Sequence, residues 1–66
     1  MTGTIVRLVR DRGFGFIAVG GYEDIFFHRS ALENAVFEHL REGRTVELEI
    51  MNSAKGPRAA SVQVID

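Results

Sequence analysis

The chain carries two short aromatic segments close together, Gly13-Phe14-Gly15-Phe16-Ile17 and Asp24-Ile25-Phe26-Phe27-His28. In an extended strand, alternate side chains project to the same face. Phe14 and Phe16 therefore share one face, opposite Ile17. The second segment alternates in the same way, with Phe26 and His28 on one face. One face of each segment suits a hydrophobic core, and the other offers flat rings that suit unpaired bases.

Size and composition limit what the protein can be. The 66 residues are 45% hydrophobic and 26% charged, which indicates one small globular domain over residues 1–66 rather than a disordered chain. A pocket for a large cofactor is not expected in so short a chain. The absence of cysteine excludes disulfides and thiolate metal sites. Because no apolar run approaches the roughly 20 residues of a membrane span and the N-terminus lacks a secretory layout, we expect a cytoplasmic protein with no membrane partner.

The net charge of -1 argues at first against a nucleic-acid ligand, because phosphate neutralisation draws on surplus lysine and arginine. The charges are unevenly distributed, however. Residues 1–30 and 51–66 each have a small basic excess, whereas residues 31–50 are acidic. A mildly basic face with an acidic back fits this distribution. A surface on which mixed charges only provide solubility fits it equally well.

Segments rich in β-branched and aromatic residues recur along the chain, with turn signals between them. The ranges that predict strands are 5–9, 14–19, 25–28, 45–51 and 59–65. The first range has apolar residues on both parities, which predicts a bulge or a strong bend. A helical turn capped by Ser30 is expected between residues 30 and 34, and Lys55-Gly56-Pro57 marks the last turn. Five short strands without a long helix predict a small β-barrel or sandwich.

Several motifs resemble those of the bacterial cold-shock proteins. Arg12-Gly13-Phe14-Gly15-Phe16-Ile17 resembles the first nucleic-acid motif of that family, with arginine in place of the usual lysine. Ile25-Phe26-Phe27-His28 resembles the second motif, and further matches follow at the expected spacings over nearly the whole chain. The resemblance implies an all-β fold, the five-stranded antiparallel Greek-key barrel known as the OB-fold.

The resemblance also implies a function. It implies a non-catalytic protein that binds single-stranded RNA or DNA with weak sequence preference, as an RNA chaperone or a regulator of transcription or translation. We expect such a protein to be a monomer without a cofactor. The stacking platform that the resemblance implies consists of Phe14, Phe16, Phe26, His28 and Phe37. The basic residues that it places near the phosphates are Arg12, Lys55 and Arg58.

Two places depart from the family pattern. Where the family usually has Lys-Trp-Phe-Asn, this chain has Val6-Arg7-Leu8-Val9, so Arg7 replaces the exposed tryptophan. Arg29 stands where a further aromatic residue is often found. Arginine can stack on bases and neutralise phosphate, so we expect both arginines to face the ligand; otherwise they belong to surface ion pairs. An alternative function follows, in which the barrel's ligand face has become a protein-interaction surface.

Two residues, Phe37 and Asp24, each have two interpretations, and a third, His28, has no partners for a catalytic role. Phe37 lies in irregular chain and is either a platform ring or an anchor for a loop under the barrel end. Asp24 either accepts a hydrogen bond from a base edge or belongs to turn chemistry. His28, with Asp24 and His39, reproduces no metal-ligand set and no nucleophile–base arrangement. The sequence therefore predicts no catalytic residue and no metal site.

Overall fold

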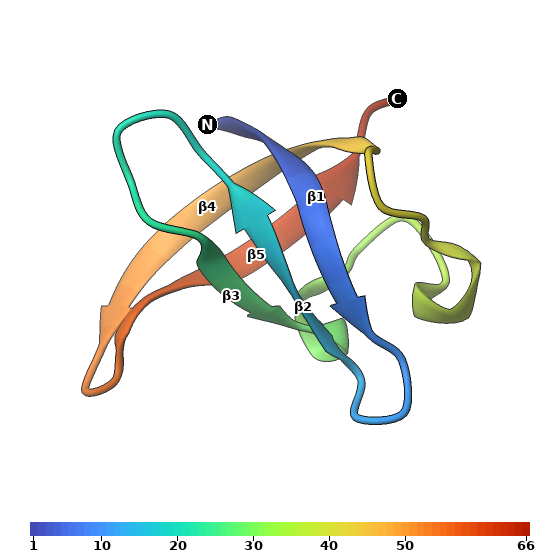
Figure 1. Ribbon diagram of the computed structural model, residues 1–66, viewed down its shortest axis with the longest axis horizontal. Helices are drawn as coiled ribbons and strands as arrows, with labels where there is room; N and C mark the ends of the chain where they lie inside the picture. Colours follow the sequence, from blue (N-terminus) through green and yellow to red (C-terminus); the bar gives the residue numbers. More distant parts are fainter.

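The computed structural model describes residues 1–66, and their five strands close into a barrel. The strands are β1 (Thr2–Val9), β2 (Phe14–Ala18), β3 (Ile25–His28), β4 (Thr45–Ser53) and β5 (Gly56–Val64). Around the barrel they follow the order β1-β2-β3-β5-β4, and β4 pairs with β1 (Figure 1). The pairs are antiparallel except β3–β5, which is parallel. The predicted all-β, five-stranded barrel is confirmed.

Alternation along the strands separates the core from the outer face. Ile17, Ile25 and Phe27 are fully buried, whereas Phe14 and Phe16, on the other parity, are only partly buried. Each fully buried large apolar side chain contributes about 1.5–3 kcal/mol of transfer free energy. The complete core consists of Ile5, Ile17, Val19, Ile25, Phe27, Phe37, Leu40, Val46, Leu48, Ala59 and Val62.

The irregularity predicted in the first strand lies at Val6. The pairing of β1 with β2 shifts between Ile5 and Arg7, so Val6 has no partner in that register. Ile5 is fully buried and Val6 is 42% exposed. Without this bulge, Arg7 would share the core face with Ile5; with it, Arg7 is exposed and pairs with Phe16 on β2. The bulge thus turns a charged side chain towards the outer aromatic face.

Gly15 permits the close packing of the three strands below the outer rings. A Cβ atom at this position would lie 2.6 Å from the carbonyl oxygen of Arg7 and 2.8 Å from Cε1 of Phe27. Any side chain there would collide with both the β1 backbone and a core ring. The glycine between the two outward phenylalanines is therefore a packing requirement of the barrel.

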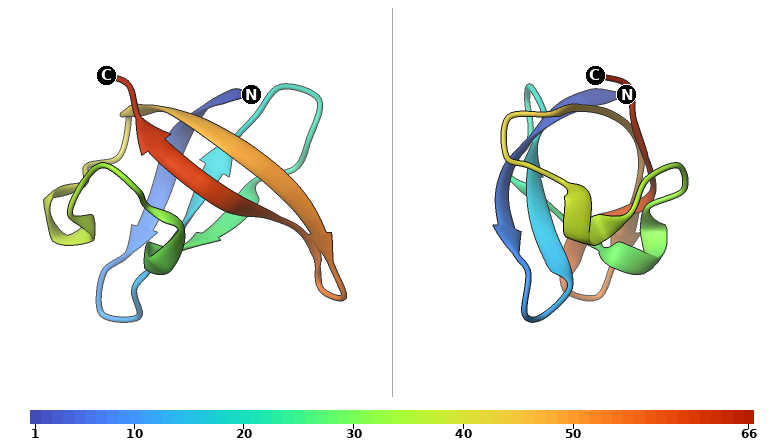
Figure 2. Two further views of the ribbon diagram at one scale, coloured as in Figure 1. Left: turned by 180° about the vertical axis from the view of Figure 1, so that it is seen from behind. Right: turned by 90° about the vertical axis from the view of Figure 1, so that its right-hand side faces the viewer.

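Two 3-10 turns, η1 (Arg29–Ala31) and η2 (Phe37–His39), interrupt the long connection between β3 and β4. Figure 2 shows this connection lying against one side of the barrel. The predicted capping by Ser30 is wrong, because the cap of η1 is His28, whose ring nitrogen accepts the Ser30 N–H. The η2 turn was not predicted. No helix in the structure has the length and apolar character needed to cross a membrane.

Phe37 belongs to the core and not to the outer face. Its side chain is 4% exposed, and its ring centroid lies 6.2 Å from that of Phe27. The side chain of Arg10 donates hydrogen bonds to the carbonyl oxygens of Glu38 and Leu40, which holds η2 against the barrel. The prediction that Phe37 is a platform ring is therefore wrong, and the loop-anchor interpretation describes it correctly.

The last hairpin turns one residue earlier than the predicted Lys55-Gly56-Pro57 turn. β5 already begins at Gly56, which has a positive φ of 110°. Pro57 pairs with Asn52 at the start of β5, where the missing N–H of proline is tolerated. The turn thus brings Lys55 to the tip of the hairpin.

Candidate nucleic-acid interface

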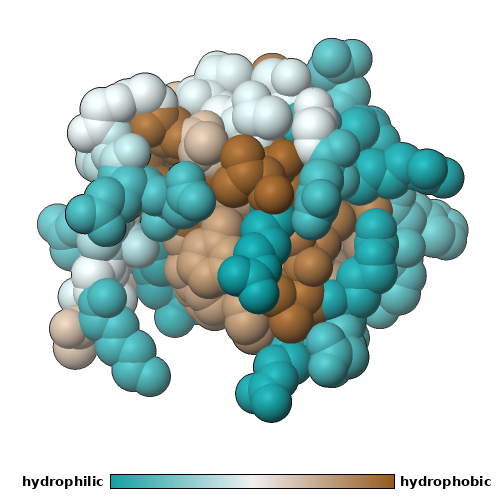
Figure 3. All heavy atoms as spheres, in the orientation of Figure 1, coloured by the Kyte–Doolittle hydropathy of each residue, from teal (hydrophilic) through white to brown (hydrophobic).

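Three phenylalanine rings from β2 and β3 meet on the outer face of the barrel. The ring centroids of Phe14 and Phe16 are 5.9 Å apart, those of Phe14 and Phe26 are 5.3 Å apart, and those of Phe16 and Phe26 are 6.0 Å apart. All three side chains are partly exposed. Figure 3 shows an apolar patch at the centre of this face with hydrophilic side chains around it. We call these three rings the platform.

Strand register explains why the platform forms. Phe16 pairs directly with Phe26 across β2 and β3, and Phe14 pairs with His28. Since the opposite parity fills the core, the four side chains share the outer face. The sequence pattern predicted this arrangement of the three rings and the histidine, and the structure brings them together.

His28 stands at the end of the platform in a defined orientation. Its Nδ1 accepts a hydrogen bond from the backbone N–H of Ser30 at 3.1 Å and lies 2.9 Å from the Ser30 hydroxyl oxygen. Because Nδ1 acts as an acceptor, the neutral ring carries its proton on Nε2. That N–H has no hydrogen-bond partner within the protein, whereas Nδ1 is held by Ser30.

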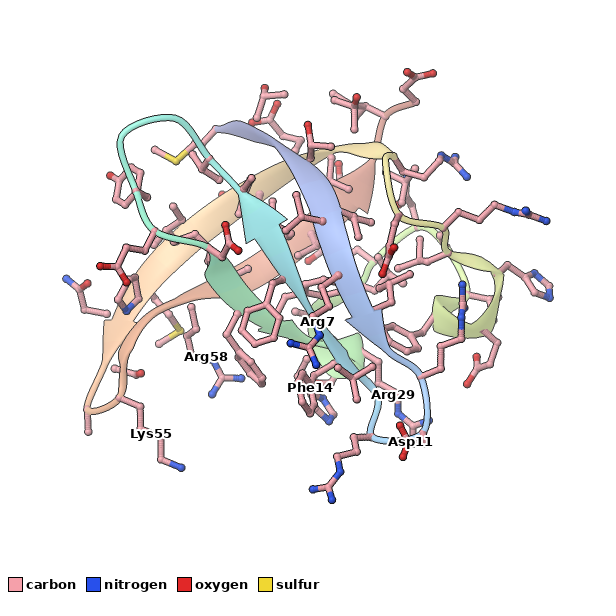
Figure 4. The ribbon with its side chains drawn as sticks, in the orientation of Figure 1. Arg7, Asp11, Phe14, Arg29, Lys55 and Arg58 are labelled. Atoms are coloured by element: carbon pink, nitrogen blue, oxygen red, sulfur yellow. The ribbon has the colours of Figure 1, made fainter.

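Basic side chains approach the platform from two directions. The guanidinium carbon of Arg58 lies 5.4 Å from the centroid of the Phe26 ring, a cation–π contact. Lys55 is exposed at the tip of the β4–β5 hairpin. Figure 4 shows Lys55 and Arg58 on one side of the view, Arg29 on the other, and Arg7 between them.

Three adjoining depressions follow the platform. Phe16 lines the first and the second, and Phe26 lines the second and the third. The depressions therefore form one continuous track along Phe16 and Phe26. The other side chains along it belong to Arg7, Tyr22, Glu23, Asp24, Ser53, Lys55, Pro57 and Arg58.

Comparison with known proteins identifies the family. The family model described as the 'Cold-shock' DNA-binding domain matches residues 1–65. The chain belongs to this family. Cold shock-like protein CspLB of Listeria monocytogenes is 46% identical over 61 residues, which are 92% of each chain. Cold shock-like protein CspB of Escherichia coli K12 is 45% identical over 67 aligned positions, which cover 100% of this chain and 94% of the relative.

Two predicted arginines of this cold-shock domain lie next to the ends of the strands that carry the platform. Arg12 is exposed in the turn between β1 and β2. Arg29 is exposed too, but its guanidinium lies 3.7 Å from the carboxylate of Glu38, and its side chain lies over Gly13. Arg29 therefore forms the surface ion pair named as the alternative to ligand contact, and an exposed pair of this kind contributes little stability.

Sequence reasoning missed part of the track of the cold-shock domain. Tyr22 and Glu23 line it, together with Asp24, for which base contact was one of two interpretations. All three residues lie in the connection that leads into β3. The only feature of the sequence that could have indicated these residues is their position, since this loop joins the two strands that carry the platform.

Three acidic residues of the cold-shock domain lie together outside the track. Glu33, Glu47 and Glu49 line a separate depression that shares no residue with the track. The N-terminal ammonium of Met1 donates a hydrogen bond to Glu47 and lowers the pKa of that carboxyl below its ordinary value. A phosphate backbone is disfavoured there. No group of three or more acidic or histidine side chains is arranged to hold a metal ion.

Proposed function

We propose that this cold-shock domain binds single-stranded RNA or DNA as a monomer, without catalysis, by stacking unpaired bases on Phe14, Phe16 and Phe26. One observation carries the proposal. Three rings contact one another on the outer face although the opposite parity already supplies the core. The buried core contains none of these three rings. Base stacking, in contrast, requires aromatic rings on the outer face. The track is lined by residues of separate segments of this chain.

The platform sets the strength and the length of the interaction. A base stacked on an aromatic ring contributes about 1–3 kcal/mol, as judged by alanine substitution, and one barrel of this type covers roughly 4 to 16 nucleotides. The groups available to phosphates are Arg12, Lys55 and Arg58. Since these are few, the affinity should depend only shallowly on salt.

Weak RNA secondary structure is the proposed target. A protein that binds only the unpaired strand shifts the equilibrium towards that strand by mass action. Bases held on the platform cannot pair with a second strand, so short hairpins open when the protein is in excess. This activity is an RNA-chaperone role, and it needs no chemical step.

The variant Phe16→Ala tests the proposal. Labelled oligouridine and oligothymidine are titrated with wild type, Phe16→Ala and the control Val36→Ala, whose side chain is 54% exposed outside the track. We expect Phe16→Ala to weaken binding at least about fivefold and Val36→Ala to bind as wild type. Circular dichroism establishes that each variant is folded.

Two results would overturn the proposal. If wild type binds neither oligonucleotide at low salt, or if folded Phe16→Ala binds as tightly as wild type, the outer face is better explained as a protein-interaction surface. A catalytic function has its own test. RNA hydrolysis by purified protein that disappears in His28→Ala would contradict the non-catalytic part of the proposal.

A further inference from the structure

One depression of the track is the only one of the three in which a guanidinium and two carboxylates meet. It is lined by Arg7, Phe16, Glu23 and Asp24, is open to solvent, and has a volume of about 560 Å³. We call it the Phe16 recess. It combines an aromatic ring with one side chain that only donates hydrogen bonds and two that, when ionised, only accept them.

The backbone brings these groups together from separate segments. The bulge in β1 turns Arg7 outwards and pairs it with Phe16. Glu23 and Asp24 come from the connection that leads into β3. None of the three charged side chains forms an ion pair or a side-chain hydrogen bond within the protein. Their donors and acceptors are free for a ligand.

The charges of the Phe16 recess select what can occupy it. Two carboxylates against one guanidinium repel a phosphate group, so the sugar–phosphate chain is expected to run nearer Lys55 and Arg58. A cationic side chain of a protein partner has no acceptor and would leave the donors of Arg7 unpaired. A neutral, flat group that has both acceptors and donors on its edges is the occupant that fits.

Among the bases, guanine matches these groups most completely. Its O6 and N7 accept the two donors of an arginine fork, and its N1–H and 2-amino group offer two adjacent donors to a carboxylate. Uracil and thymine offer one N–H between two carbonyl oxygens, which carboxylates repel. Cytosine offers one amino group to a carboxylate, and adenine lacks the O6 acceptor and the N1–H donor.

We infer that the Phe16 recess selects guanine, with Arg7 donating to O6 and N7 and Asp24 or Glu23 accepting from N1–H and the 2-amino group. The inference rests on the proposed function, because the base must first stack on Phe16. It adds a preference at one position of an otherwise sequence-tolerant track.

The test uses oligouridine of about seven nucleotides, within the roughly 4 to 16 expected for one barrel, with a single guanine, cytosine or adenine placed at each position in turn. At the best position we expect the oligonucleotide with guanine to bind about fivefold tighter than the one with uracil. This ratio is the low end of the discrimination by a bidentate contact, and we expect the low end because the recess is open to solvent. Inosine, which lacks the 2-amino group, and 7-deazaguanine, which lacks N7, should each lose part of this gain.

Substitutions in the Phe16 recess test whether its side chains cause the preference for guanine. In Arg7→Gln and Asp24→Asn the ratio of guanine to uracil affinity should fall towards one. The matched control Glu49→Gln, an exposed acid outside the track, should keep the wild-type ratio. If Asp24→Asn alone keeps the preference, the double variant Glu23→Gln/Asp24→Asn decides whether either carboxylate reads the base.

The outcomes separate the two proposals. If the all-uridine oligonucleotide binds but no position favours guanine, the inference is overturned and the proposed function stands. If guanine is favoured equally in Arg7→Gln and in the double variant, the recess is not the reader, and the inference fails. If no oligonucleotide binds at all, the proposed function itself is overturned.

Discussion

Arg58 places its guanidinium carbon 5.4 Å from the ring centroid of Phe26, and the same two residues form the parallel pair between β3 and β5. The contact that closes the barrel therefore also delivers a positive charge to the platform. Residues far apart in the chain meet there. Removing the guanidinium should affect binding more than folding, because the side chain of Arg58 is partly exposed.

Variants of Arg58 separate charge from geometry. Arg58→Lys keeps the charge but loses the planar group that lies over the ring, so we expect weaker binding with an unchanged salt dependence. Arg58→Gln should weaken binding and also reduce the slope of log affinity against log salt by about 0.7 for one lost phosphate contact on a single strand. Oligothymidine titrations at several salt concentrations measure both quantities. An unchanged slope in Arg58→Gln would show that Arg58 contacts no phosphate.

Arg7→Trp should strengthen binding to oligouridine and oligothymidine. A tryptophan at this position adds stacking area next to Phe16, and one further stacked base contributes about 1–3 kcal/mol. The same change removes the guanidinium from the Phe16 recess, so the guanine preference should disappear. Titration of the two sets of oligonucleotides gives both results. Equal or lower affinity of Arg7→Trp for oligouridine would contradict this prediction.

Gly15→Ala should destabilise the barrel. The added Cβ would lie 2.6 Å from the carbonyl oxygen of Arg7 and 2.8 Å from Cε1 of Phe27, and relieving such overpacking costs about 1–3 kcal/mol. Urea unfolding measures the loss. The control is Gly20→Ala, because a Cβ at Gly20 meets no atom within 4 Å; it should unfold near the wild-type midpoint. Equal midpoints for the two variants would contradict the packing role of Gly15.

Phe37→Leu tests the corrected position of Phe37. Its ring packs on Phe27 in the core, so the shorter side chain should lower the free energy of unfolding by about 1–3 kcal/mol. The affinity of the folded variant for oligothymidine should match wild type. Thermal unfolding and titration below the unfolding temperature measure the two effects. A loss of affinity in the folded variant would return Phe37 to the platform.

Local alternation is what made the platform predictable. Phe16 and Phe26 share a face for the same reason that Ile17 and Phe27 share the opposite one, and this depends only on neighbouring residues. The bulge at Val6 was predictable as well, because both parities of its strand are apolar. These features follow from the period of a β-strand, which the sequence displays directly.

Features that depend on distant contacts were not predictable in this way. The burial of Phe37 depends on Phe27 and on the hydrogen bonds that Arg10 donates to the η2 segment. The Phe16 recess combines a bulged strand with the connection before β3. In each case the deciding partner lies outside the strand or turn concerned, so periodicity and turn signals carry no information about it. The ion pair of Arg29 with Glu38 is of the same kind.

Stacking of single-stranded nucleic acid on the platform is the central claim. The most direct test is the affinity of wild type and Phe16→Ala for labelled oligothymidines of increasing length, at about 50 and 200 mM salt. We predict wild-type binding that levels off within roughly 4 to 16 nucleotides, depends weakly on salt, and weakens at least about fivefold in Phe16→Ala. No wild-type binding at the lower salt, or equal binding by the folded variant, would contradict it.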